Sequence, residues 1–354
     1  MRIVLSNASS RWGGVHKVTE ILARGLQDRG HDIAVFGYPG GMLEDRMRDV
    51  APFEPILKGM DFHPLVLARA TSALRRHRAD VVLTMMKKDV TMTAPAAAAL
   101  GVPVVVRHAN QQPLGHNIFW RLLYGTIPSL HVTNARATKD TLLSSARWLK
   151  EDQVRVIYNG IDAAPFEEAV PMDLGLPGDA VVAGYAGSFE ARKGVIELAK
   201  AWSSVASRLP NAHLALFGKG LLEREMRAIL ADAPRVHWFG YHRNVTSALK
   251  SLDVLVLPSY REGAPNIVLE AMSAGAAVVA TAVSGTPELV RDGIEAKLIP
   301  SHDATALGDA LVAVMSDRVL RDRLAAAGKA RVLDKYRLSW MIDAYEEVLR
   351  EISG

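Results

Sequence analysis

Short runs of apolar residues recur along the chain and are separated by longer amphipathic segments. Such runs, without polar alternation, are typical of strands in a parallel sheet that is covered on both faces. They predict strands at residues 3–5, 32–36, 81–83, 102–106, 130–133 and 154–157, and again at 181–185, 213–217, 236–239, 254–257, 277–280 and 296–299. The segments between them predict helices, for example at 15–26, 93–100, 135–149, 221–230 and 266–274, and three helices end the chain at 303–316, 318–334 and 338–352.

This alternation of strand and helix predicts an α/β fold in two halves. A turn at residues 158–162 and a stretch with Pro165, Pro171, Gly175, Pro177 and Gly178 mark a boundary at about 158–178. The βα rhythm then starts again. We therefore predict two doubly wound domains that face an interdomain cleft.

Composition and charge add limits rather than a function. The chain has 354 residues, enough for two cores, and no Cys, which excludes disulfides and thiolate metal sites and is compatible with a reducing cytoplasm. No apolar run approaches the roughly 18 residues of a membrane-spanning helix, and residues 2–5 enter a strand directly. We expect a cytoplasmic protein. The net charge of +4 says little by itself.

Two acidic residues stand where ligands bind in such folds. Glu262 follows the apolar run at 254–257, and Glu270 lies about one turn into the helix after it. Ligands of open parallel sheets bind outside the carboxyl ends of the strands. Two carboxylates there suit a ligand rich in hydroxyls, because ionised carboxylates accept several hydrogen bonds. The alternative is a pair of solvated surface acids.

Cations and a helix start accompany the two glutamates. Arg192 and Lys193 precede Gly194 at a strand-to-helix loop, a position that suits phosphate binding, although two solvated cations would look the same. In the loop 282–288, Thr286 is the predicted N-cap and Pro287 opens a helix, so free backbone N–H groups are expected there. The set fits a diphosphate attached to a ribose and to a sugar.

The first half offers weaker signals. Gly13-Gly14 opens a helix but is not part of G-x-G-x-x-G, which disfavours a dinucleotide-dependent dehydrogenase. His108, at a strand end, is either a hydrogen-bond donor to a sugar or phosphate or a structural histidine. The aromatic segment 117–124, with Trp120, is either a core helix or an exposed lip against an apolar acceptor.

These motifs, in this order, resemble the retaining glycosyltransferases of family 4 over nearly the whole length of the chain. The match rests most on Glu262-Gly263 and Glu270, two glutamates separated by seven residues. Supporting matches are Gly187 with Lys193-Gly194, Leu257-Pro258-Ser259, residues 270–275, residues 285–290, the turn 158–162 and Gly13-Gly14.

The resemblance implies the GT-B fold of two Rossmann-like domains. Residues 1–160 would form the acceptor-side domain, joined by a C-terminal helix at about 338–354 that crosses back to it. Residues 161–337 would form the domain that binds the nucleotide-sugar donor.

The resemblance also implies roles for single residues. Glu270 would accept hydrogen bonds from the ribose, Glu262 would lie near the sugar's hydroxyls and anomeric carbon, and Lys193 would neutralise the departing diphosphate. His108 would contact the donor sugar, so that Glu262, Lys193 and His108 form the catalytic set. Further donor contacts would come from Gly14, Ser188, Arg192, Gly263, Ala264, Pro265, Asn266, Gly285 and Thr286.

Departures from the family pattern concern charge. The family often has Arg where this chain has Ser188, and whether Arg192 replaces that charge stays open. No D-x-D motif and no Cys/His cluster occur, so metal-independent chemistry with a UDP- or GDP-linked sugar and no further cofactor is expected. The family implies transfer with retention by front-face substitution, in which the departing phosphate helps to deprotonate the acceptor.

The sequence says less about the site that binds the acceptor. Arg75, Arg76, Arg78, Lys87 and Lys88 form a basic cluster that is either a solvated face or a contact for anionic lipid headgroups. With Trp120 as an apolar lip, the second interpretation favours a glycan or lipid-linked acceptor and peripheral binding at the inner face of the cytoplasmic membrane. Rival functions are a nucleotide-sugar epimerase of the same fold and a non-catalytic glycan-binding or assembly protein. Nucleic-acid binding is disfavoured.

Overall fold

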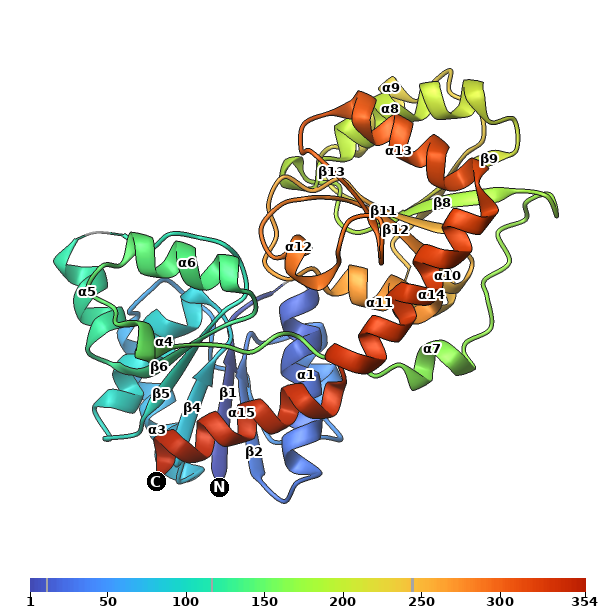
Figure 1. Ribbon diagram of the computed structural model, residues 1–354. Helices are drawn as coiled ribbons and strands as arrows, with labels where there is room; N and C mark the ends of the chain where they lie inside the picture. The colour runs from blue at the N-terminus through green and yellow to red at the C-terminus, as the bar shows by residue number, and fades with distance from the viewer. Residues whose placement is uncertain (11, 116, 243–244) are drawn as a thin grey trace. The chain divides into compact units, whose positions relative to one another are not determined.

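The computed structural model describes residues 1–10, 12–115, 117–242 and 245–354. The chain divides into two compact units, Met1–Gly160 with Ser339–Gly354, and Ile161–Leu338. Each is a parallel sheet between helices (Figure 1), so the prediction of two Rossmann-like domains is confirmed.

The first unit holds, in its described residues, a seven-stranded sheet in the order β3-β2-β1-β4-β5-β6-β7. All pairings are parallel. The strands are β1 (Arg2–Asn7), β2 (Asp32–Gly37), β3 (Phe53–Glu54), β4 (Val81–Thr84), β5 (Val104–His108), β6 (Pro128–Thr133) and β7 (Val154–Val156). The helices are α1 (Gly14–Gln27), α2 (Met42–Met47), α3 (Pro64–Arg76), α4 (Lys87–Ala98), α5 (Ile118–Gly125), α6 (Arg136–Ser145) and α15 (Leu338–Ser353).

The C-terminal helix α15 belongs to the first unit, as predicted. Ile342 packs where a Cβ on Gly25 of α1 would stand, and Tyr345 accepts a hydrogen bond from Arg107 of β5 at 3.0 Å. Arg29, at the end of α1, pairs with Asp343. The helix therefore covers the sheet face on the side of α1.

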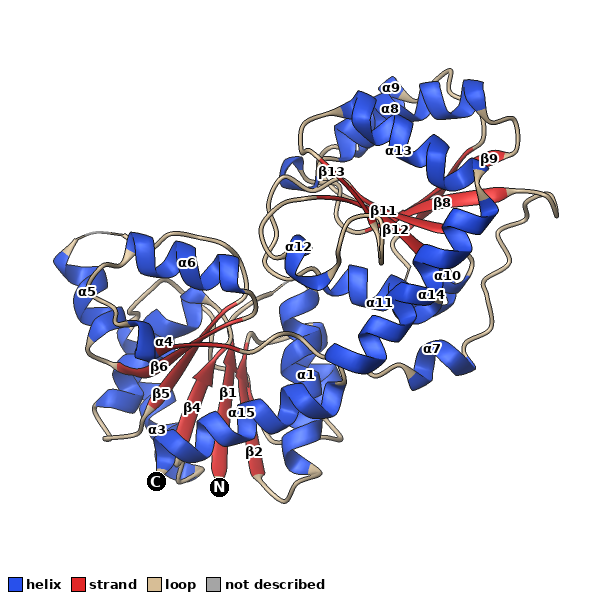
Figure 2. Cartoon of the chain, in the orientation of Figure 1, coloured by secondary structure: helices blue, strands red, loops and turns tan. Residues whose placement is uncertain are grey.

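The second unit holds, in its described residues, a six-stranded parallel sheet in the order β10-β9-β8-β11-β12-β13. Figure 2 shows helices on both faces of it. The strands are β8 (Val181–Ala186), β9 (Ala212–Phe217), β10 (Val236–Gly240), β11 (Val254–Leu257), β12 (Ala277–Thr281) and β13 (Lys297–Ile299). The helices are α7 (Ala164–Glu168), α8 (Val195–Arg208), α9 (Glu223–Ile229), α10 (Val245–Lys250), α11 (Asn266–Ala274), α12 (Thr286–Leu289), α13 (Ala304–Ser316) and α14 (Arg318–Lys335).

Strand burial explains why the apolar runs located the sheets so well. Strands β4, β9, β11 and β12 are buried at every position, because helices cover both faces. In the second unit the core is built largely on the large side chains of Trp202, Tyr185 and Phe189.

Several predicted helix bounds were wrong. The helix expected at 93–100 begins at Lys87, because the Asp89 carboxylate accepts the backbone N–H groups of Met85 and Met86, at 2.9 Å each, and so caps the helix earlier. The helix expected at 135–149 ends at Ser145, since Ala146 leaves the helical backbone conformation. Helices α2, α3, α7 and α10 were not predicted.

Candidate active site

The second sheet reverses its strand order between β8 and β11. In doubly wound sheets the loops that leave this point form the ligand crevice. The loop after β8 carries Lys193, and the loop after β11 carries Glu262. Sequence positions 69 residues apart are thereby brought into contact.

Glu262 is held by three neighbours. Its Oε1 accepts from Lys193 Nζ at 2.5 Å and from Ser259 Oγ at 2.7 Å, and its backbone N–H donates to Ser284 Oγ at 3.1 Å. Arg192 Nη1 lies 3.9 Å from Oε2. The residue is 6% exposed. One carboxylate oxygen is thus fully engaged, and the other is the acceptor that remains for a ligand hydroxyl.

The backbone around Lys193 is fixed by a glycine. Ala191–Lys193 forms a 3₁₀ turn, and Gly194 follows with a φ of 63°. A Cβ at Gly194 would lie 1.8 Å from the carbonyl oxygen of Pro258. Tyr260 N–H also donates to Arg192 O at 2.8 Å. The two loops therefore approach so closely that a side chain at position 194 does not fit.

Glu270 lies in α11 and is 7% exposed. The alternative interpretation of the two glutamates as solvated surface acids is therefore wrong. Asn266 starts the helix, Pro265 precedes it in extended conformation, and Ala264 is buried. These residues form the compact connection between the two glutamates.

The loop before α12 differs from its prediction. Gly285 N–H donates to Gly263 O at 2.9 Å, Thr286 N–H to Val283 O at 3.0 Å, and Glu288 N–H to Gly285 O at 3.1 Å. Pro287 has no N–H, so residues 285–288 offer no free backbone donors, contrary to expectation. Thr286 is the first helical residue rather than the N-cap, which is Gly285. The Thr286 hydroxyl is buried and has no partner among the described residues.

Ser188 and Arg192 share the loop after β8. The Ser188 carbonyl accepts the Tyr185 hydroxyl at 2.8 Å, which fixes the loop's first turn. The Arg192 guanidinium pairs with Glu190 at 3.2 Å and stays half exposed. Its Nη1 also lies near Glu262, so a cation does stand in this region although position 188 is Ser.

In the first unit, Gly14 and His108 lie at the carboxyl edge of the sheet. Helix α1 begins at Gly14, with Gly13 as an N-cap in extended conformation and no side-chain cap or acidic residue in the first turn. His108 ends β5. Both positions agree with the predicted edge.

The hydrogen bonds of His108 and His131 determine which ring nitrogen of His108 carries the proton. His131 Nε2 lies 2.9 Å from the carbonyl oxygen of Tyr124, which can only accept, so Nε2 carries the proton and Nδ1 is an acceptor. His108 Nε2 lies 3.0 Å from that Nδ1 and must donate to it. Burial keeps the pKa of His108 well below its usual range, and the neighbouring His131 lowers it further. His108 is therefore neutral, with Nδ1 as an acceptor, and not the hydrogen-bond donor that the sequence suggested.

The buried His108–His131 pair leads us to expect that the protein loses stability as the pH falls. Burial lowers the pKa of His131 to about 4, below the ordinary 6.5, so the unfolded chain takes up this proton first as the pH falls. The contribution of His131 to the free energy of unfolding is complete above pH 6.5. It falls between 6.5 and 4 by up to about 1.4 kcal/mol per pH unit. His131→Gln keeps one donor and one acceptor, and urea unfolding at several pH values should show a shallower loss. Equal slopes in both proteins would contradict the argument.

A cavity of about 870 Å³ opens at the same edge of the first unit. It lies beside the reversal point between β1 and β4. The predicted residues Lys87, Lys88, His108 and Trp120 all line it. Lys87 Nζ stands 4.1 Å from the centre of the Trp120 ring, a cation–π contact.

The predicted basic cluster does not form one face. Arg75 and Arg76 end α3 and Arg78 follows before β4, whereas Lys87 and Lys88 come after β4. The two groups therefore lie at opposite edges of the sheet, because a strand separates them. Arg76 pairs with Glu54 at 2.6 Å. Only the two lysines belong with the cavity.

Helix α5 combines both interpretations of the aromatic segment. Leu123 and Tyr124 are buried, while Ile118 and Leu122 are 68% and 55% exposed. Phe119 is also exposed and contacts Phe62 edge to face, with ring centres 5.1 Å apart. One side of the helix is core and the other is an apolar surface.

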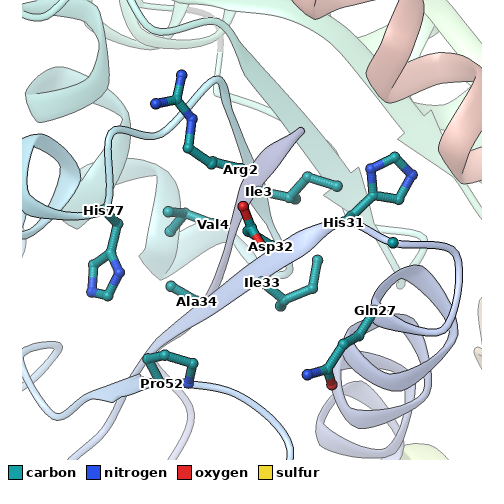
Figure 3. Close-up of a pocket in the computed structure, with 11 residues that line it drawn as sticks. Arg2, Ile3, Val4, Gln27, His31, Asp32, Ile33, Ala34, Pro52 and His77 are labelled. Atoms are coloured by element: carbon teal, nitrogen blue, oxygen red, sulfur yellow. The ribbon is translucent and has the colours of Figure 1, made fainter.

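A second cavity, of about 410 Å³, lies at the opposite edge of the first sheet, beside β1 and β2. Figure 3 shows His77 and His31 on either side of these strands. Three of its polar side chains are already paired, since Arg2 binds Asp80, His31 binds Glu346 at 3.0 Å and His77 binds Glu54 at 2.8 Å. We assign it a structural role.

The described residues contain neither a metal-binding group of side chains nor a membrane-spanning helix. No three His, Asp or Glu side chains in the described ranges are grouped to hold a metal ion. Within the same ranges, no helix has both the length and the apolar character to cross a bilayer.

The sequence matches two family models. One, described as Glycosyltransferase Family 4, matches residues 12–164, and the other, described as Glycosyl transferases group 1, matches residues 180–317. The matches fall on the two sheets in turn.

Curated relatives carry related names. The chain is 27% identical to the phosphatidyl-myo-inositol mannosyltransferase of Mycolicibacterium smegmatis, over 97% of this chain and 91% of that protein. It is 27% identical to the lipopolysaccharide core biosynthesis glycosyltransferase LpsD of Rhizobium meliloti, over 94% of each. It is 29% identical to LpsE of the same organism, although this match covers 58% of this chain and 60% of LpsE.

Solved structures share the fold over the whole chain. HepE of Anabaena in complex with UDP-glucose superposes with a TM-score of 0.83 at 19% identity, covering 99% of both chains. WaaG, a glycosyltransferase involved in lipopolysaccharide biosynthesis, gives 0.75 at 18% identity, covering 99% of this chain and all of WaaG. With both sheets matched by glycosyltransferase models and the GT-B fold found in both structures, the chain belongs to glycosyltransferase family 4.

Proposed function

We propose that the protein transfers a sugar from a UDP- or GDP-linked donor to a glycan or lipid-linked acceptor of the cell envelope, with retention of anomeric configuration. The observation that carries this proposal is the buried Glu262–Lys193 pair at the reversal point of the second sheet, next to the helix of Glu270. The names of LpsD and of the mannosyltransferase support the class of acceptor.

The contacts of the site suggest how the residues divide the work. Lys193 would neutralise the diphosphate while the bond from the anomeric carbon to the phosphate oxygen breaks. Glu262 would hold a sugar hydroxyl through Oε2, since Oε1 is already occupied by Lys193 and Ser259. Glu270 would hold the ribose. In this front-face route the acceptor oxygen bonds to the same carbon, and its proton passes to the departing phosphate.

His108 fits a supporting role in the first unit. Because its Nε2–H is donated to His131, only Nδ1 is left for a ligand. It would accept a hydrogen bond from a sugar hydroxyl and would not protonate the leaving group.

Nucleotide binding tests the donor assignment. UDP or GDP at 100 times its Kd should add roughly 2.7 kcal/mol to the free energy of unfolding, seen as a higher Tm. CMP and ADP serve as comparisons, and EDTA should not change the result if no metal is required. Glu270→Gln should weaken the effect of UDP or GDP. If neither diphosphate stabilises the protein, the donor assignment is wrong.

We also propose that the protein binds a membrane surface through the first unit. Ile118, Phe119 and Leu122 form an exposed apolar face on α5, and Met60 and Leu65 are exposed as well. Lys87 stands over Trp120 of the same helix. Apolar side chains beside cations suit the headgroup region of an anionic bilayer.

Flotation with vesicles tests membrane binding. Vesicles of phosphatidylglycerol and phosphatidylcholine should carry the wild-type protein upward at low salt, and Ile118→Ser/Leu122→Ser should lower the bound fraction several-fold. The matched control is Leu221→Ser/Val319→Ser, which removes two residues that are 94% and 78% exposed in the second unit. Equal loss in both double variants would contradict a specific face on α5.

A further inference from the structure

The 870 Å³ cavity of the first unit has an unbalanced set of charges. Lys87, Lys88 and Arg107 line it, against one acidic lining residue, Asp61. Asp61 accepts the Thr91 hydroxyl at 2.8 Å. Even when the buried Asp89 beside Lys88 is counted as charged, three cations face two acids. Burial also raises the pKa of Asp89 to about 8, which lowers the share of the ionised carboxylate.

The two lysines have no carboxylate partner within the part of the chain that the structure describes. Lys87 is held over Trp120 instead. Elsewhere in the first unit, cations such as Arg2, Arg46 and Arg76 do pair with acids. A pair of uncompensated ammonium groups beside a cavity attracts an anion.

Arg107, which also lines the cavity, adds to the positive potential. It is almost fully buried, and its side chain donates to two neutral groups, the Tyr345 hydroxyl at 3.0 Å and the Asn159 side-chain oxygen at 2.9 Å. Its Nη1 has no hydrogen-bond partner among the described residues. A buried guanidinium without a carboxylate raises the local potential, because no solvent screens it.

Apolar and aromatic side chains make up much of the remaining lining. Met60, Met85, Leu114, Trp120 and Tyr124 contribute to it. Such walls suit the carbon face of a sugar ring, while the His108 Nδ1 acceptor and the lysines fix its polar groups. The cavity therefore has the features of a site for an anionic sugar rather than for a bare ion.

We propose that this cavity holds the acceptor, and that the acceptor carries a phosphate or carboxylate group which Lys87 and Lys88 bind. The inference rests on the proposed transferase function and narrows its acceptor to acidic glycans and anionic glycolipid headgroups. Neutral acceptors of the same size would lack the group that these two lysines recognise.

Binding of model anions to the full chain tests the proposal. The probes are glucose 6-phosphate, glucuronate and neutral glucose, measured by calorimetric titration at equal ionic strength. The wild-type protein should bind at least one of the two anions about tenfold or more tightly than glucose, and Lys87→Gln/Lys88→Gln should remove that preference. Dihexanoyl phosphatidylglycerol tests a lipid headgroup, and tighter binding of it than of glucose 6-phosphate would assign the site to a lipid-linked acceptor.

Lys193→Gln is the control on the donor side. It should leave the preference for the anionic sugar intact and weaken UDP or GDP binding, whereas the double lysine variant should do the reverse. If circular dichroism shows that the double variant is unfolded, the single variant Lys87→Gln is used for the test instead. The Lys87 side chain is exposed, so its replacement should leave the fold intact. Equal binding of charged and neutral sugars by the wild-type protein, or an unchanged preference in the lysine variant, would overturn the proposal. If neither UDP nor GDP binds, the proposed transferase function itself is contradicted.

Discussion

Lys193→Gln is expected to lower the rate of sugar transfer by roughly 10²- to 10³-fold, the usual effect of removing one group that stabilises charge in a transition state. The ammonium touches Glu262 at 2.5 Å and is the cation that would face the departing diphosphate. Gln can still donate to Glu262 Oε1, so the fold should survive. The measurement is the release of nucleoside diphosphate from the donor that stabilises the protein, with an envelope glycolipid extract as acceptor.

A second measurement separates charge on the diphosphate from general damage. The wild-type protein should bind UDP or GDP more tightly than the matching monophosphate, and Lys193→Gln should lose most of that difference. Lys297→Gln is the matched control, since Lys297 pairs with Asp292 at 3.3 Å on the surface of the same unit. A full rate in Lys193→Gln, or an equal loss in Lys297→Gln, would contradict the role given to Lys193.

The sheets could be predicted because their strands are buried on both faces. Strands such as β11 and β12 are then short, almost continuous runs of Val, Leu and Ala. The first residues of the helices were harder to predict from the sequence. The N-cap of α4 is Met86, and Asp89, the third helical residue, accepts its N–H together with that of Ala8 after β1. Because Met86 is not a usual N-cap residue and Ala8 is distant in sequence, the start of this helix was not recognised.

The sequence predicts Glu262, Glu270 and Lys193 at one edge of the second sheet, but it did not predict the contact between Glu262 and Lys193. The Glu262–Lys193 pair depends on how the loops after β8 and β11 meet, which Ser259 and Gly194 decide. Similarly, no sequence pattern indicated a role for His131, although it sets the tautomer of His108. Spacing along the chain identifies edges of a sheet, whereas the partners at one edge come from tertiary packing.

The prediction of one basic cluster was wrong for the opposite reason, because residues close in sequence were expected to lie close in space. Arg75, Arg76, Lys87 and Lys88 are close in sequence, yet β4 carries the chain across the sheet between them. Nearness in sequence means nearness in space only inside one element or turn. Lys87 instead contacts the ring of Trp120 of α5, more than thirty residues later.

Gly194→Ala is expected to destabilise the second unit by about 3 kcal/mol. A φ of 63° costs a residue with a side chain roughly 1–2 kcal/mol. In addition, the new Cβ would stand 1.8 Å from Pro258 O, so the loops after β8 and β11 must separate, at a further cost of about 1–3 kcal/mol. Because Lys193 and Glu262 lie on these two loops, their contact should weaken and nucleotide binding should fall together with stability.

Gly275→Ala separates the two causes. Gly275 ends α11 with a φ of 85°, and nothing lies within 4 Å of the position that its Cβ would take. It should therefore show the cost of the left-handed conformation alone, roughly 1–2 kcal/mol. The difference between the two variants in urea unfolding measures the clash with Pro258. If Gly194→Ala costs no more than Gly275→Ala, the loops yield without strain, and the close approach at Gly194 does not hold Lys193 against Glu262.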